Sequence, residues 1–120
     1  MPNHAQVFVK VNAPVDRGAA TLITVLSRFP KLQTLESCED ISGWAWVTFV
    51  YGTRPEQWQE LAKFLFGFLG PRLTREMGDR VTVTMHVTDA GLYRAEMAVR
   101  IPAISAAVRL LAKLRTEFKD

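Results

Sequence analysis

The sequence predicts an α+β fold in which helices cover one face of an antiparallel sheet. The chain has 120 residues, of which 48% are apolar, and this length is enough to bury one hydrophobic core. Segments with strand-like alternation of apolar residues are interleaved with segments whose apolar residues recur at helical spacing. Their order is β-α-β-β-α-β-β-α, without a linker or an internal repeat. We therefore expect residues 1–120 to form a single α+β domain.

The first half of the chain predicts the first four of these elements. Residues 6–11 alternate valines with other residues, as a strand does. A turn follows, in which Asp16 is a candidate N-cap for a helix that runs to about Phe29. Residues 32–38 and 43–51 then predict two strands joined by a polar turn.

The second helix has clear start and stop signals. Residues 53–56 match a capping box with a proline in the first turn. Residues 58–69 are apolar on most sides, which predicts a helix that is deeply buried or that meets a partner chain. Gly70-Pro71 is expected to break this helix, and a second short helix would follow and close at Gly78.

The last strands have the cleanest pattern in the chain. Residues 80–88 alternate strictly, and Gly91 suits the left-handed position of a hairpin loop. This register pairs Val87 with Tyr93, Met85 with Ala95, Val83 with Met97, and Val81 with Val99. The final helix is expected to open at Pro102 and to carry a buried apolar face.

The first six elements suit a two-layer ferredoxin-like sandwich. In that arrangement the first and third strands are central neighbours, and a fifth strand would extend the sheet from the fourth. The residues expected to face the helices are Val7, Val9, Val11, Leu35, Ala45, Val47, Phe49, Tyr51, Val81, Val83, Met85 and Val87. The opposite face would then carry Phe8, Lys10, Trp44, Trp46, Thr48, Thr82, Thr84, His86, Arg94 and Glu96. A bare face of this kind would expose a large aromatic patch, so we expect something to cover it.

Residues 43–49, Gly-Trp-Ala-Trp-Val-Thr-Phe, resemble the longer signature of the RNA recognition motif family. Residues 7–9, Val-Phe-Val, resemble its shorter first-strand signature. The resemblance implies that Phe8, Trp44 and Trp46 form a platform on which bases of single-stranded nucleic acid stack. Ser42 stands where the family has a basic residue, and the last hairpin and helix have no counterpart in its minimal form.

The same order of elements equally resembles that of dimeric α/β barrels. In those proteins two sheets pack face to face and enclose a pocket. The resemblance implies that a second copy buries the aromatic face and that His86, Arg94 and Glu96 are the polar groups of the pocket. A histidine beside a carboxylate could act there as a general base.

Other kinds of site find little support in the sequence. Cys38 is the only cysteine, which excludes an internal disulfide and a cysteine-based metal site, and its neighbouring carboxylates disfavour a reactive thiolate. No phosphate-binding glycine loop and no spacing of metal ligands is present, so we expect neither a cofactor nor a metal. No set of nucleophile, base and orienting group emerges, which favours binding over catalysis.

Net charge and hydropathy limit the classes of partner that the sequence predicts. The formal net charge is +3, with the basic excess in the second half of the chain, which permits nucleic acid without requiring it. No apolar run is long enough for a membrane span, and no signal peptide is recognisable, so cytoplasmic residence is the expectation. The sequence thus predicts a homodimeric, non-catalytic binding domain that uses its aromatic sheet face for self-association or for a small ligand. The binding residues would be Phe8, Lys10, Trp44, Trp46, Thr84, His86, Arg94 and Glu96.

Overall fold

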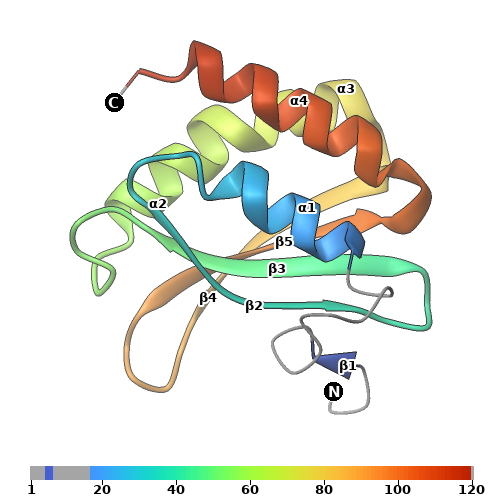
Figure 1. Cartoon of the computed structure of the whole chain (residues 1–120). Helices are drawn as coiled ribbons and strands as arrows, with labels where there is room; N and C mark the ends of the chain where they lie inside the picture. Colours follow the sequence, from blue (N-terminus) through green and yellow to red (C-terminus); the bar gives the residue numbers. More distant parts are fainter. Residues whose placement is uncertain (1–4, 7–16, 120) are drawn as a thin grey trace.

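Antiparallel strands form one sheet in the order β1-β2-β3-β5-β4 (Figure 1). The structure is a computed structural model that describes residues 5–6 and 17–119. Its strands are β1 (Ala5–Gln6), β2 (Leu32–Glu39), β3 (Trp44–Tyr51), β4 (Val81–Val87) and β5 (Tyr93–Arg100). Its helical elements are α1 (Arg17–Leu26), α2 (Gln59–Phe64), the π-helical segment η3 (Leu65–Leu69), α3 (Gly70–Met77), the 3-10 turns η4 (Gly78–Arg80) and η5 (Ile101–Ala103), and α4 (Ile104–Glu117).

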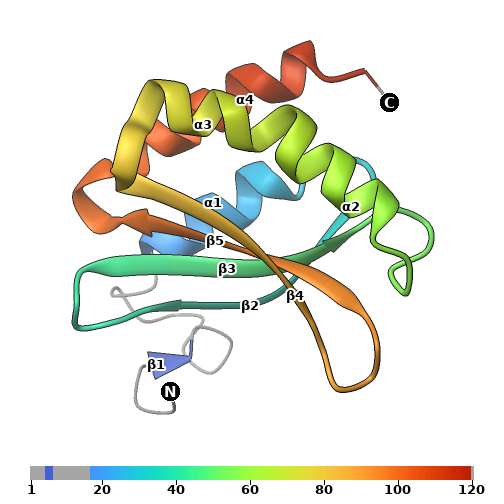
Figure 2. The same cartoon turned by 180° about the vertical axis from the view of Figure 1, so that it is seen from behind.

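All the long helices lie on one face of the sheet, as Figures 1 and 2 show from opposite sides. The expected α+β class and the helices on a single face are therefore confirmed. The core lies between the two layers. On β3, Ala45, Val47 and Phe49 are completely buried beneath the helices, because alternate residues of a strand point to the same face.

The order of the strands differs from the ferredoxin-like expectation. β3 pairs with β2 and with β5, and β1 lies beside β2 through Ala5 opposite Glu39. The first and third strands are therefore not neighbours, and the fifth strand lies inside the sheet rather than beyond the fourth. Of the expected first strand, residues 6–11, only Gln6 is described, and residues 7–11 lie outside the described part of the chain.

The β4–β5 hairpin has the register that the alternation predicts. Val87 lies opposite Tyr93 and Val81 lies opposite Val99. Gly91 has φ +83°, the left-handed conformation expected in the loop. Because β5 is held between β3 and β4, the outer edge of β4 is an edge of the sheet.

Two residues expected in the core are exposed. Leu35 is 44% exposed because it stands at a β-bulge between Thr34 and Glu36, where it has no partner on β3. Val87 is 60% exposed at the end of β4. The other described residues of that set are buried or half-buried on the helix side.

Gly70-Pro71 does not end the second helix. α2, η3 and α3 follow one another without a gap, so residues 59–77 form one rod that ends at Gly78, as expected. Pro71 has no N–H for the carbonyl of Gly67, four residues earlier, and its ring would clash with that carbonyl in an α-helix. The wider π turn avoids the clash. In this turn Gly70 donates its N–H to the carbonyl of Leu65, five residues earlier, rather than to the carbonyl four residues earlier as in an α-helix.

The expected capping box does not cap this helix. The helix begins at Gln59, several residues after Thr53–Glu56, and Trp58 gives it no side-chain cap. Thr53 instead donates its backbone N–H to the carboxylate of Glu60, over 2.7 Å. That hydrogen bond, and secondarily the charge of Lys31, lowers the pKa of Glu60.

A carboxylate from the sheet stabilises the start of α1. The backbone N–H groups of Gly18 and Ala19 donate to Oε2 of Glu39 on β2, over 3.0 and 3.3 Å. Glu39 therefore satisfies donors that the first turn of a helix leaves unpaired. The expected N-cap, Asp16, lies outside the described residues.

An ion pair between α3 and α4 should make the free energy of unfolding depend on pH. Nη1 of Arg72 on α3 lies 2.6 Å from the Glu117 carboxylate on α4, and this hydrogen bond is the main cause that lowers the pKa of Glu117. The unfolded chain binds the proton more readily. The stabilisation is therefore present above the ordinary pKa of a glutamate and is lost as the pH falls through the lowered folded-state pKa. We expect Glu117→Gln to lower the urea midpoint more at pH 7 than at pH 3. The exposed Glu56→Gln is the control, and an equal loss at both pH values in Glu117→Gln would contradict the expectation.

Candidate functional site

The two tryptophans lie on the side of β3 away from the helices, as the alternation predicts. Ala45 and Val47 are fully buried on the helix side, and Trp44 and Trp46 are half-buried on the open face. Phe8 and Lys10, which were expected to lie beside them, are outside the described residues.

An arginine covers part of this face. Arg100 on β5 lies opposite Trp44 in the sheet, and its guanidinium carbon is 4.4 Å from the centroid of the indole ring. A cation at this distance is attracted by the electrons of the ring. The ring of Trp44 is therefore not a free stacking surface: a base or another ring on that side must displace Arg100.

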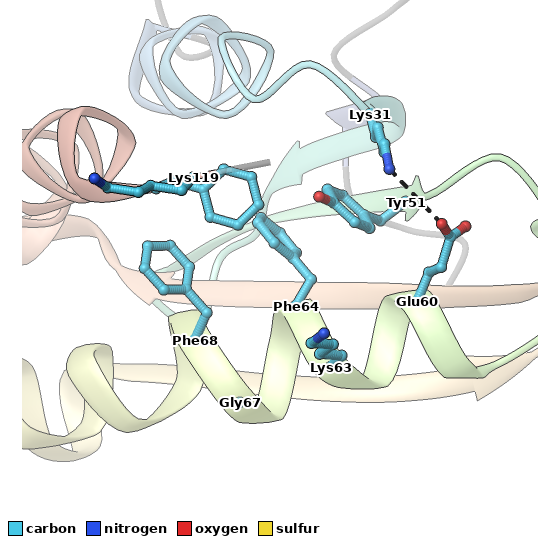
Figure 3. Close-up of a pocket in the computed structure, with 9 residues that line it drawn as sticks. Lys31, Tyr51, Glu60, Lys63, Phe64, Gly67, Phe68 and Lys119 are labelled. Atoms are coloured by element: carbon cyan, nitrogen blue, oxygen red, sulfur yellow. Dashed lines mark ion pairs between the residues drawn. The ribbon is translucent and has the colours of Figure 1, made fainter.

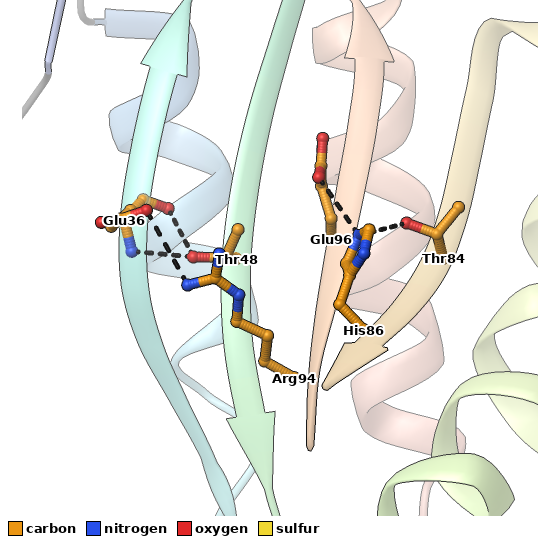
Figure 4. Close-up of polar contacts among 6 residues, drawn as sticks. All are labelled: Glu36, Thr48, Thr84, His86, Arg94 and Glu96. Atoms are coloured by element: carbon orange, nitrogen blue, oxygen red, sulfur yellow. Dashed lines mark hydrogen bonds and ion pairs between the residues drawn. The ribbon is translucent and has the colours of Figure 1, made fainter. Parts of the chain in front are cut away.

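Three of the polar residues predicted on the open face come together on β4 and β5 (Figure 4): Thr84, His86 and Glu96. Nε2 of His86 lies 3.1 Å from the hydroxyl of Thr84 and 3.5 Å from the carboxylate of Glu96. Both contacts use the same ring nitrogen. In a nucleophile–base–carboxylate relay, the hydroxyl and the carboxylate contact opposite nitrogens of the imidazole. The arrangement is thus a cross-strand polar cluster without the geometry of a relay.

Arg94 belongs to a neighbouring contact rather than to the His86 cluster. Its guanidinium lies 4.0 Å from the Glu36 carboxylate on β2, while the buried hydroxyl of Thr48 accepts the backbone N–H of Glu36 over 3.1 Å (Figure 4). Arg94 thereby reaches across β3 to the opposite strand. A hollow of about 410 Å³ adjoins both clusters, and its lining is mostly polar: His86, Val87, Thr88, Asp89, Arg94 and Glu96.

A second pocket, of about 430 Å³, lies on the helix side of the molecule (Figure 3). Its lining comes from four separate parts of the chain: Lys31, Tyr51, Glu60, Lys63, Phe64, Gly67, Phe68, Phe118 and Lys119. No pattern in the sequence predicted this pocket. The continuous apolar character of residues 58–69 was a signal for it, but that pattern alone does not distinguish a buried helix from a pocket wall.

The described residues contain no group of three or more potential metal ligands. Within the same part of the chain, no helix combines the length and the apolar composition needed to cross a membrane. Comparisons of the chain with protein-family models, with curated proteins and with solved structures find no match.

Proposed function

We propose that this chain is a non-catalytic binding module that works as a homodimer, with two copies joined along β4. One observation carries the proposal: the outer edge of β4 pairs with no strand that the structure describes. β4 has seven residues, with no proline, no lysine and no bulge. An edge strand of this kind presents unpaired backbone groups to any other chain, and natural proteins protect such edges or use them for pairing.

The other side of the sheet shows the protective features that β4 lacks. β2 contains the bulge between Thr34 and Glu36, and β1 pairs with its last residues. Glu36 adds an exposed charge beside the bulge. These features disfavour pairing with another chain on that side. The contrast supports β4 as the edge that meets a partner.

The sequence of β4 is complementary to itself. If two copies pair antiparallel about a twofold axis at Thr84, Val81 lies opposite Val87 of the second copy, and Val83 opposite Met85. These pairs fall on the helix side of both copies, while Thr82 meets His86 on the open side. On the helix side every apolar residue thus meets an apolar residue, and no like charges lie opposite each other.

The surroundings of the strand fit this arrangement. Val87 is 60% exposed, and pairing with Val81 of a second copy would remove apolar surface from water. A hollow of about 480 Å³ lies at the other end of β4, lined by Leu73, Thr74, Gly78, Asp79, Val81, Thr82 and Val83. The end of a partner's strand, with the exposed Val87, would lie beside it.

Thr84→Lys tests the proposal because it places two positive charges opposite each other at the axis. Within one copy the new lysine is solvent-exposed and lies opposite Glu96, so the fold should tolerate it. We expect the wild type to sediment as a dimer and the variant to dissociate with a Kd at least tenfold higher, since like charges directly opposite are destabilising. Gln33→Lys, the same charge change on exposed β2, should remain dimeric. A monomeric wild type, or a Thr84→Lys dimer as tight as the wild type, contradicts the proposal.

Single-stranded nucleic acid is the alternative occupant of the open face. Trp44 and Trp46 share that face with Arg94 and Arg100, which gives a basic and aromatic surface. Arg100 already lies over Trp44, which disfavours base stacking on that ring. In the same sedimentation samples, a fluorescent oligonucleotide should therefore stay unbound. Binding that Trp44→Ala weakens by about 1–3 kcal/mol would support the nucleic-acid alternative instead.

A further inference from the structure

The pocket on the helix side has a rigid aromatic wall. Tyr51 on β3 stacks on Phe64, with ring centroids 4.0 Å apart and an angle of 4° between the planes. Phe118, which follows α4, packs edge-on against Phe64 at 5.4 Å and lies 5.0 Å from Phe68. Aromatic pairs in these geometries attract each other beyond their burial. The wall is thus held in place before any ligand arrives.

The rim of this pocket is positively charged. Lys31, Lys63 and Lys119 line it together with one acidic residue, Glu60 (Figure 3). Nζ of Lys31 lies 3.8 Å from the Glu60 carboxylate, so these two charges compensate each other. Lys63 and Lys119 form no ion pair with any residue in the described part of the chain. Two uncompensated ammonium groups therefore border an apolar cavity.

The π-helical segment forms part of the pocket wall. Gly67 and Phe68 belong to η3 and line the pocket. A Cβ atom at Gly67 would have no other atom within 4 Å, so the wall is open at this position. Single π turns within α-helices occur frequently at functional sites. Here the turn brings a residue without a side chain next to the aromatic wall.

From these features we infer that the pocket binds an apolar monocarboxylate, whose hydrocarbon body lies against Phe64, Phe68 and Phe118 and whose carboxylate lies at the basic rim, to which Lys63 and Lys119 contribute from different sides. The cavity volume of about 430 Å³ is within the range of small-molecule sites. Apolar walls with a few charged groups at the mouth match a ligand that is apolar at one end and anionic at the other. This inference is independent of dimerisation, because no residue of β4 lines the pocket.

Calorimetric titration with decanoate, below its micelle concentration, tests the inference. We expect one saturable site per chain in the wild type. Decanol, which has the same chain length but no charge, should bind at least tenfold more weakly. The double variant Lys63→Gln/Lys119→Gln should lose the preference for decanoate over decanol. Arg109→Gln, an exposed basic residue of α4 outside the pocket, is the control and should keep the preference.

Gly67→Leu separates loss of the pocket from loss of the fold. Gly67 lines the pocket and a Cβ there would meet no other atom within 4 Å, so a leucine should occupy space at the pocket wall. We therefore expect decanoate affinity to fall at least tenfold while the urea midpoint does not decrease. Three results would overturn the inference. These are no saturable decanoate binding to the wild type, full binding to Gly67→Leu, and equal affinity for decanoate and decanol. Sedimentation with phosphatidylglycerol vesicles in the absence of decanoate binding would assign the basic rim to a lipid surface instead.

Discussion

Phe29→Ala should lower the free energy of unfolding by about 3–5 kcal/mol, the range for removing a fully buried phenylalanine ring. Phe29 lies in the turn after α1 and is 0% exposed. Its ring packs edge-on against Phe64 at 5.3 Å and against Phe118 at 5.6 Å. It therefore joins α1, the long helical rod and the end of α4. These three elements are tightly packed and cannot move together to fill the space that the ring leaves. A cavity should therefore remain.

Urea unfolding measures this effect, and Phe66→Ala is the matched control. Phe66 belongs to the same helical rod but is 49% exposed, so the same substitution there should change the free energy of unfolding by only about 0.5 kcal/mol. An unchanged m-value in Phe29→Ala would show that the loss comes from the folded state. Equal losses in the two variants would mean that Phe29 does not hold the helices together.

Alternation predicts the faces of the strands well because each side chain of a strand points either into the core or to the open side of the sheet. The same pattern places Val47 in the core, Trp46 opposite it, and fixes the whole register of the β4–β5 hairpin. Alternation does not specify which strand lies beside which. β3 and β5 are both apolar on one face, and only their pairing, with Val47 opposite Met97, shows that they are the central strands.

Some contacts that stabilise the helices and turns leave no local signal in the sequence. The first turn of α1 receives its acceptor from Glu39 on β2, and Thr53 donates to Glu60 rather than capping a helix beside it. Leu35 has the apolar character of a core residue, but a bulge places it outside. Neither a bulge nor a tertiary cap leaves a periodic pattern in the sequence.

The two candidate sites differ in how far the sequence predicts them. The sequence grouped His86, Arg94 and Glu96 because they belong to one hairpin with a clear register. His86 does contact Glu96, whereas Arg94 reaches toward Glu36 on β2. The aromatic pocket needed Tyr51 and Phe118 to meet across the sheet and the last helix, although they are far apart in the sequence. Its lysines are ordinary surface residues in the sequence. Only the fold places them around one cavity.

Gly70 is the second position where a small change should have a large effect. Its dihedral angles are those of an ordinary helix, φ −57° and ψ −51°, so the glycine is not needed for backbone conformation. It is needed for space. A Cβ atom at this position would lie 2.7 Å from the backbone oxygen of Leu65, the acceptor of the π turn, and a backbone oxygen cannot move as a side-chain end can.

We expect Gly70→Ala to lower the free energy of unfolding by about 1–3 kcal/mol, as overpacking of a rigid site does. Gly67→Ala is the matched control, with the same substitution three residues earlier. A Cβ there has no other atom within 4 Å, so it should raise stability by about 0.5–1 kcal/mol through the helix propensity of alanine. Chemical denaturation of both variants measures whether each one lowers or raises the free energy of unfolding. Equal effects would mean that the π turn does not require Gly70.

Adding Pro71→Ala should reduce the cost of Gly70→Ala, because a donor at residue 71 lets the rod adopt the narrower α turn that Pro71 prevents.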